Sequence, residues 1–229
     1  MNKGKLFVVA TPIGNLDDIT YRAIKTLKSV AFILAEDTRE SKKLLDKYDI
    51  HTQLISYRDQ NHEKIINKIV EKLDIGLDLA IISDNGTPLI SDPGYKLVRY
   101  LREEGYVISP IPGPSAVISA LSISGLPTDR FSFLGFLPKS DSKRIEIFEE
   151  FFNLDTTVVV YESPKRLFKL LDLILKLDGN LFVCAIRDMT KKHEKIYFGK
   201  ICDIIKNLET DDLRNNPYGE WVVLISKKI

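Results

Sequence analysis

The sequence has few cysteines and histidines, the side chains that most often form disulfides and metal sites. Its 229 residues include two cysteines, Cys184 and Cys202, and three histidines, His51, His62 and His193. The cysteines are too few and too far apart for a disulfide framework, and the histidines have no metal-ligand spacing. We therefore predict no metal centre and two reduced cysteines that act as small apolar side chains.

Long hydrophobic runs and an excess of charge of one sign are also missing. No run reaches the roughly 18 apolar residues of a membrane span, and the first ten residues lead into a strand pattern rather than a signal peptide. We expect a cytoplasmic protein with no membrane partner. The formal net charge is +1, from 33 basic and 32 acidic residues. Global charge therefore gives no argument for a nucleic-acid partner, which would have to be held by local patches.

Three local clusters of basic residues are candidates for such patches. Each cluster alone is more often simply a solvated face. The clusters are Lys139, Lys143 and Arg144, then Lys165 with Arg166, and Lys191, Lys192 and Lys195.

Short apolar runs alternate with stretches of helical period in the first half of the chain. That alternation is typical of an α/β fold whose parallel strands are covered on both faces. Helical spacing is clear in residues 23–30 and 65–73. The pattern predicts strands at residues 6–10, 32–35, 79–83 and 107–111, joined by crossover helices.

The strand spacing changes after the segment Pro112-Gly113-Pro114. Further strands are predicted at residues 131–135, 157–161, 181–186, 194–199 and 221–225, and residues 210–216 read as a loop. Residues 183–186 and 196–198 are too close for an intervening helix, so they predict a hairpin and a mixed second sheet. We expect two α/β domains, at residues 1–114 and 115–229.

Ligands of open α/β sheets lie beyond the carboxyl ends of the strands, where loops bring backbone donors together. Four such loops, at residues 11–16, 36–39, 84–94 and 112–116, are rich in Pro, Gly, Asp and Thr. Proline and glycine together give a stiff, shaped loop that suits ligand binding. Ordinary capped turns explain any one of these loops equally well, but explain four together less well.

Several common ligand motifs are absent from these loops. The first loop has neither the three glycines of a dinucleotide fingerprint nor the Lys-Ser/Thr end of a phosphate-binding loop. No Gly-x-Ser-x-Gly turn provides a nucleophilic serine. NAD, ATP and serine-hydrolase chemistry are therefore disfavoured.

Taken in order, the loops resemble the RsmI branch of the tetrapyrrole-methylase superfamily. The resemblance runs from Leu6 to the last predicted strand, and the joint pattern is far more specific than any single loop. The strings that carry it are ATPIGNL at 10–16, EDTR at 36–39, SDNGTPLISDPG at 83–94, PGPSA at 112–116, GLPTDRF at 125–131, YESPKRL at 161–167 and RDMTKKHE at 187–194.

This resemblance implies two α/β domains with S-adenosylmethionine folded in the cleft between them, and a homodimer. It also implies methylation of the ribose 2′-hydroxyl of a cytidine in the decoding region of small-subunit (16S) ribosomal RNA. The residues that it assigns to the cofactor are Pro12, Asp84, Asn85, Gly86, Thr87, Ile90, Ser115, Ala116, Glu162, Asp188 and Met189. Asp84 is the carboxylate best suited to the positive charges of the cofactor.

A ribose hydroxyl is a weak acid, so its methylation benefits from a general base or a nearby cation. Glu36, Asp37 and Glu162 are candidate bases, and Arg39 or Lys191 could stabilise the developing alkoxide. Helix caps and surface ion pairs explain each of these residues equally well. For RNA, we expect phosphate contacts from the basic clusters and a base stacked on an aromatic ring such as that of Tyr57 or Tyr161.

Two departures from the family pattern are mild: Asn85 replaces a common Ala, and Asp188-Met189 replaces Glu-Leu. A third is that many relatives continue beyond the last strand. Two rival functions stay open. A tetrapyrrole C-methyltransferase would share fold and cofactor, although such enzymes carry a glycine-rich first loop that this chain lacks. A non-catalytic cofactor-binding module would keep the loops without a methyl acceptor.

Overall fold

The computed structural model describes residues 3–229, which fall into two compact units. The N-terminal unit ends at Ser115 and the C-terminal unit comprises Ala116–Ile229. This division lies one residue beyond the boundary expected from the sequence. Among the described residues, no helix is long and apolar enough to cross a membrane.

Sheet A of the N-terminal unit has five parallel strands in the order β3-β2-β4-β1-β5. The parallel first sheet expected from the sequence is therefore confirmed. The strands are β1 (Lys5–Val9), β2 (Phe32–Ala35), β3 (Gln53–Ser56), β4 (Leu79–Ile82) and β5 (Val107–Ile111).

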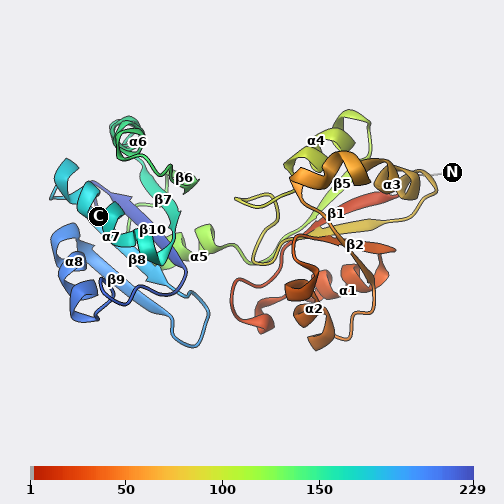
Figure 1. Ribbon diagram of the computed structural model, residues 1–229, viewed down its shortest axis with the longest axis horizontal. Coiled ribbons are helices and arrows are strands. Elements are labelled where there is room, and N and C mark those ends of the chain that lie inside the picture. Colours follow the sequence, from red (N-terminus) through yellow and green to blue (C-terminus); the bar gives the residue numbers. More distant parts are fainter. Residues whose placement is uncertain (1–2) are drawn as a thin grey trace. The chain divides into compact units, whose positions relative to one another are not determined.

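Helices cover both faces of sheet A (Figure 1). One core cluster holds side chains of α1 (Tyr21–Ser29) and α2 (Thr38–Lys47), and a second holds those of α3 (His62–Asp74) and α4 (Tyr95–Glu103). Burial on both faces explains why β4 reads as an unbroken apolar run. Thr20 caps α1 by accepting a hydrogen bond from the Ala23 amide at 3.1 Å.

Strand β3 was missed by the sequence prediction. It is the edge strand of sheet A and has only four residues, and Gln53 and Ser56 at its ends are exposed. A short polar edge strand carries little hydrophobic signal, although it resists pairing with other chains. Its position matters because Tyr57 and Arg58 follow it at the carboxyl edge of the sheet.

Sheet B of the C-terminal unit is mixed, with the order β6-β7-β10-β8-β9. Strands β6 and β7 are parallel, whereas β10 is antiparallel to β7 and β8, and β8 and β9 form the predicted hairpin. The mixed sheet and the hairpin are therefore confirmed. The strands are β6 (Phe131–Phe136), β7 (Thr157–Glu162), β8 (Phe182–Arg187), β9 (Lys195–Lys200) and β10 (Trp221–Ser226).

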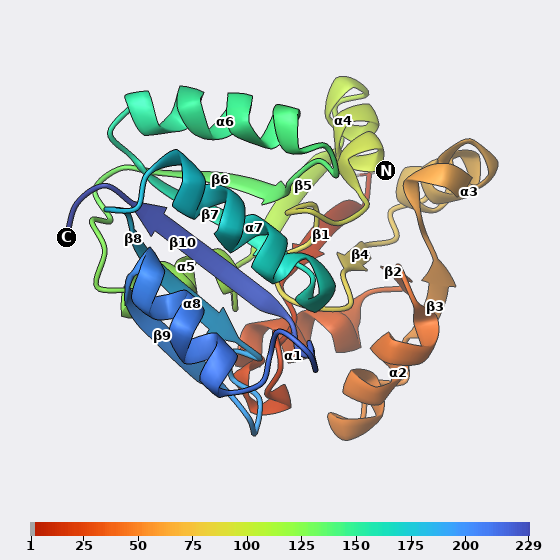
Figure 2. The same ribbon diagram turned by 60° about the vertical axis from the view of Figure 1, so that its left-hand side comes forward.

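The larger core of this unit lies between sheet B and α6 (Asp141–Asn153), α7 (Pro164–Leu177) and α8 (Ile201–Thr210). Helix α5 (Ala116–Ile123) packs against β10. Figure 2 shows α7 and α8 in front of the sheet and α5 behind it. Both cysteines are free, and Cys184 is buried like the small apolar side chain that was expected, whereas Cys202 is exposed on α8.

Candidate functional site

Hydrogen bonds join the loops after β1 and β4 at the carboxyl edge of sheet A. The Thr11 amide donates to the Gly86 carbonyl at 2.8 Å, and the Gly86 amide donates to the Pro12 carbonyl at 3.3 Å. The buried Thr11 hydroxyl lies 3.1 Å from the Ser83 carbonyl and 3.3 Å from that of Gly86. Because β1 and β4 are neighbours in the sheet, these bonds turn two loops into one stiff structure.

A third loop is joined to the first two. The Thr87 hydroxyl donates to the Pro114 carbonyl at 3.1 Å, which ties the segment after β5 to the loop after β4. The structure thus brings together Pro12, Gly86 and Thr87, which the sequence assigned to one site. Thr11, which is not among the residues expected at the site, ties the first loop to Ser83 and Gly86.

The loop after β4 has an unusual backbone. Gly86 has a φ of +78°, and a Cβ atom there would lie 3.1 Å from Cγ2 of Ile13. Leu89 and Ser91 are also in the left-handed region, with φ values of +71° and +67°. Non-glycine residues rarely adopt this conformation, and where they do, they cluster at ligand sites. Ile90 lies between them and is 44% exposed.

Four carboxylates gather at the same edge: Glu36 and Asp37 after β2, and Asp84 and Asp92 after β4. The Asp37 amide donates to Asp84 Oδ1 at 3.2 Å. Burial raises the pKa of Asp92 to about 6, and the charges of Glu36 and Asp84 contribute, although a hydrogen bond from Ser83 opposes the rise. From the sequence, only its place in the loop after β4 points to Asp92.

The pKa values of Glu36 and Asp84 are also raised, in both cases chiefly by burial. The charges of Asp84 and Asp37 add to the rise in the pKa of Glu36, those of Asp37 and Glu40 add to the rise at Asp84, and the Arg58 guanidinium opposes the rise in both. Arg58 follows the unpredicted strand β3, and its Nε donates to the Glu36 carbonyl at 3.3 Å. Negative charge at this edge is therefore poorly neutralised by the protein itself.

Asp37 differs from its neighbours because it caps α2. Its carboxylate accepts from the Arg39 amide at 2.9 Å and from Arg39 Nη2 at 2.8 Å. These hydrogen bonds hold the pKa of Asp37 well below its usual range. The Arg39 side chain is 87% exposed. Asp37 thus acts as a helix cap and forms a surface ion pair with Arg39, which is the structural role expected as the alternative to catalysis.

At the carboxyl end of β7, Glu162 is the centre of a buried ion-pair network. Its side chain is fully buried and accepts from Arg166 Nε at 2.7 Å, from Arg144 Nη2 at 3.5 Å and from the Ser163 amide at 2.8 Å. Arg144 Nε also donates to the Pro138 carbonyl at 2.6 Å, and Arg166 Nη2 donates to the Leu137 carbonyl at 2.9 Å. The network fixes the loop between β6 and α6.

Two residues that were expected to contact RNA, Arg144 and Tyr57, are buried instead. Arg144 is 1% exposed and paired with Glu162, so it is not a surface phosphate contact. Tyr57 is likewise 1% exposed and bonded to His62, so it has no free face for stacking a base. The Tyr57 hydroxyl and Arg144 Nε and Nη2 have partners inside the protein, whereas Arg144 Nη1 is buried without one among the described residues.

The segment after β8 forms a tight turn held by hydrogen bonds and ion pairs that involve Asp188, Lys191 and Glu220. Asp188 and Thr190 have φ values of +50° and +63°, and Met189 between them is buried. Asp188 Oδ1 accepts from the Glu220 amide at 3.2 Å. Lys191 Nζ lies 2.7 Å from the Glu220 carboxylate and 3.5 Å from that of Asp188. Burial lowers the pKa of Lys191, but these two carboxylates outweigh it and the net shift is upward.

The carboxyl edge of sheet A fits a ligand that carries positive charge. Three carboxylates there have raised pKa values, and a cation placed among them would relieve their mutual repulsion. Gly86 is buried with a left-handed backbone, and a Cβ atom there would press on Ile13, so this glycine serves the packing of the loop that carries Asp84. A ligand with a sulfonium and an ammonium group, such as S-adenosylmethionine, has positive charges that complement these carboxylates.

Comparison with known proteins places the fold. A sequence model of the family described as Tetrapyrrole (Corrin/Porphyrin) Methylases matches residues 5–205. A solved cobalt precorrin-4 methyltransferase has a TM-score of 0.70 and 17% identity over 97% of this chain and 94% of its own. A solved diphthine synthase has a TM-score of 0.71 and 11% identity over 97% and 90%. At these identities, the two structures show a shared fold.

Curated relatives are more similar in sequence. Ribosomal RNA small subunit methyltransferase I of Rickettsia prowazekii is 46% identical over 99% of this chain and 80% of its own length. The protein of the same name from Thermotoga maritima is 44% identical over 98% and 99%. The chain therefore belongs to the tetrapyrrole methylases and, within them, to the family of ribosomal RNA small subunit methyltransferase I. The family expected from the sequence is confirmed.

Proposed function

We propose that this protein transfers a methyl group from S-adenosylmethionine to the ribose 2′-hydroxyl of a cytidine in the decoding region of small-subunit ribosomal RNA. The observation that carries the proposal is the match, over nearly the whole chain, to relatives whose name specifies methylation of this RNA. The matched tetrapyrrole enzyme is only 17% identical, so the rival tetrapyrrole substrate has weaker support.

For the cofactor, the proposal rests on the carboxyl edge of sheet A. Asp84 and its acidic neighbours would balance the positive charges of the methionine portion, and the left-handed backbone at Gly86 would keep the loop that carries Asp84 in shape. Asn85, Thr87, Pro12 and Ile90 belong to the same or the adjoining loop. When bound, S-adenosylmethionine supplies an electrophilic methyl group. The predicted contacts of Ser115, Ala116, Asp188 and Met189 stay predictions that single substitutions and cofactor titration can test.

For the acceptor, the hydroxyl oxygen forms the new bond to carbon, the sulfur–carbon bond breaks, and the hydroxyl proton must leave. Glu36 is the predicted base that best fits this task, because burial raises its pKa toward neutrality. Asp37 is held by Arg39, and Glu162 is enclosed by two arginines. We therefore propose Glu36 as the proton acceptor.

Single-turnover methylation tests these assignments. Glu36→Gln is expected to slow methyl transfer at saturating cofactor, beyond the weaker cofactor binding that follows from losing one charge of the acidic cluster, whereas Asp37→Asn and Lys191→Ala are expected to act through local stability. Full single-turnover activity in Glu36→Gln would exclude it as the base. Full activity in Asp37→Asn or Lys191→Ala would likewise remove that residue from the candidates.

The substrate is tested by incubating the protein with labelled S-adenosylmethionine and either small ribosomal subunits or uroporphyrinogen. We expect label in the RNA alone. Nucleoside mass spectrometry of small-subunit RNA from cells with and without the protein should then show a loss of 2′-O-methylcytidine in its absence. Equal amounts in both would refute the ribose assignment, and label in neither substrate would favour the non-catalytic module.

We also propose that the protein forms homodimers in the cytoplasm, where its RNA substrate is found. Large apolar side chains of the C-terminal unit are exposed, including Ile118 on α5 at 56%, and Ile196 and Phe198 on β9 at 43% and 50%. Exposed apolar side chains of this kind are typical of interfaces. Light scattering after size exclusion is expected to give twice the 26.1 kDa mass of the chain, and a monomer mass would refute this.

A further inference from the structure

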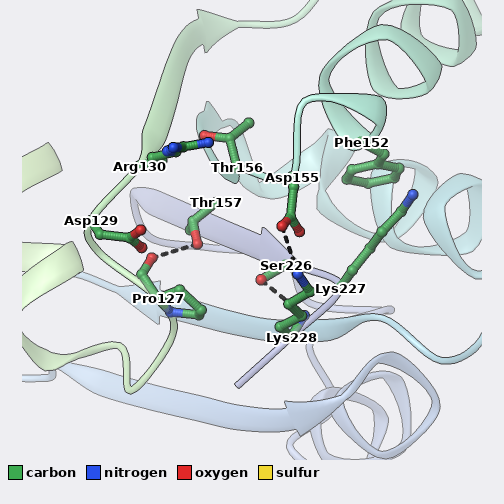
Figure 3. A pocket seen from close by; sticks show the side chains of 10 residues that line it. All are labelled: Pro127, Asp129, Arg130, Phe152, Asp155, Thr156, Thr157, Ser226, Lys227 and Lys228. Carbon is green, nitrogen blue, oxygen red and sulfur yellow. Dashed lines mark hydrogen bonds and ion pairs between the residues drawn. The ribbon is translucent and has the colours of Figure 1, made fainter.

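A pocket of about 340 Å³ lies within the C-terminal unit, at the edge of sheet B opposite Glu162. It is formed where β6 and β7 begin and β10 ends (Figure 3). Strand β7 has six residues, so Thr157 in the pocket lies roughly 17 Å from Glu162 at a rise of about 3.3 Å per residue. A ligand here would therefore be remote from the carboxyl ends of β7 and β8.

The pocket is polar and has an excess of positive charge. Its cations are Arg130, Lys227 and Lys228, and its anions are Asp129 and Asp155. Lys228 Nζ lies 2.6 Å from the Asp155 carboxylate, so this pair is internally neutral. The hydrogen bond from Lys228 lowers the pKa of Asp155, and the charges of Lys228, Arg130 and Lys227 contribute. Arg130 and Lys227 remain, with Asp129 as the other anion, so the pocket has an excess of about one positive charge.

Those two cations have no carboxylate partner of their own among residues 3–229. Figure 3 shows Arg130 beside Thr156, and Lys227 along Phe152, whose ring centroid is 5.9 Å from Lys227 Nζ. A guanidinium offers five donors in a fork that matches phosphate oxygens, and an ammonium adds a second point of charge.

The floor of the pocket adds a hydroxyl donor. The Thr157 hydroxyl is used, since it donates to the Pro127 carbonyl at 2.6 Å. The buried Ser226 hydroxyl accepts from the Lys228 amide at 3.1 Å, so its own hydrogen stays available to a ligand oxygen. The pocket thus combines a forked cation, a flexible cation and a hydroxyl.

We propose that this pocket binds a phosphodiester of an RNA strand. A phosphodiester carries one negative charge, which equals the excess in the pocket, whereas a free phosphate monoester carries nearly two near neutral pH. The volume lies within the usual range of ligand sites and leaves room for an adjoining ribose. The inference rests on the proposed function, because that function supplies the RNA. It adds a phosphate contact remote from the carboxyl ends of β7 and β8.

The test measures how RNA binding depends on salt. A fluorescent RNA from the decoding region is titrated with the wild-type protein and with Arg130→Gln/Lys227→Gln over a range of salt concentrations. Losing the one phosphate contact that the two cations share is expected to lower the slope of log K against log salt by about 0.7 for single-stranded RNA. The matched control is Lys64→Gln/Lys68→Gln, which removes the same charge from the exposed surface of α3 and should leave the slope unchanged.

Parallel measurements separate the possible failures. Cofactor affinity and melting temperature should match the wild type in both double variants, because none of the four side chains is buried. An unchanged slope in Arg130→Gln/Lys227→Gln, with normal RNA methylation by the wild type, would overturn the pocket proposal alone. Tight binding of cytidine monophosphate that requires Arg130, again with an unchanged RNA slope, would also overturn it. A wild-type protein that neither binds nor methylates the RNA would instead refute the proposed function.

Discussion

Replacing Asp92 by asparagine tests the electrostatic account of the carboxyl edge of sheet A. Burial raises the pKa of Asp92 from its ordinary value of 3.8 to about 6. In the unfolded chain this carboxyl group ionises near pH 4, whereas the folded protein keeps it protonated until about pH 6. The folded state therefore loses stability as the pH rises from about 4 to about 6, and the loss persists above that range.

The size of the effect follows from the shift. At 1.36 kcal/mol per pKa unit, a rise of about two units corresponds to roughly 3 kcal/mol. Asp92 is only partly buried, so solvent screening reduces this to about 1 to 2 kcal/mol. Asp92→Asn lacks the ionisation, and is expected to be more stable than the wild type by that amount at pH 7.5 and nearly equal to it at pH 4.

Urea denaturation of both proteins at several pH values between 4 and 8 measures this difference directly. The value at pH 4 serves as an internal control, because Asp92 in the folded protein is neutral there, as asparagine is, and the unfolded carboxyl group is only partly ionised. A stability difference that is constant over the whole range would refute the reasoning. Cofactor titration of the same variant adds a functional readout: its affinity for S-adenosylmethionine is expected to fall, because the cluster loses one charge that would balance the ligand.

Two further predictions concern backbone strain and the buried ion-pair network. Gly86→Ala is expected to cost about 2 kcal/mol and to weaken cofactor binding, whereas Gly105→Ala, with φ of +74° but open space around it, should cost about 1 kcal/mol and leave binding intact. Equal costs would show that the contact with Ile13 is unimportant. Glu162→Gln leaves the Arg144 guanidinium buried without a counter-charge and should cost about 3 kcal/mol in urea denaturation. Arg166→Gln, which removes a half-buried partner, should cost about 1 kcal/mol, and the reverse order would contradict the network described above.

The sequence predicted the fold well wherever strands are apolar. Both sheets, the hairpin and nine of the ten strands follow from runs such as residues 79–82, whose burial on both faces leaves a plain apolar signal. Strand β3 lacked that signal because it is short and lies at an edge. Loop strings likewise identified the family, because stiff turns need particular residues at fixed places.

The sequence alone did not predict which charged side chains form ion pairs and which are buried. Lys139, Lys143 and Arg144 form one basic cluster in the sequence. In the structure, Arg144 is buried against Glu162 while the two lysines are exposed. Only the packing of α6 against β7 decides this. Asp92 gained its raised pKa in the same way, from burial and neighbours that are distant in sequence.

The order of strands in sheet A has a consequence for how the chain folds during its synthesis. Strand β1 is made first, but Leu6 pairs with Leu79 and Lys5 pairs with Val107, so β1 gains its first partner only after β4 has left the ribosome and its second only after β5 has done so. In sheet B, by contrast, Arg187 pairs with Lys195 across a short turn. Non-local parallel pairing is slow and local hairpins are fast. The N-terminal unit, although synthesised first, is therefore expected to be the slower of the two to form its sheet and the more dependent on chaperones.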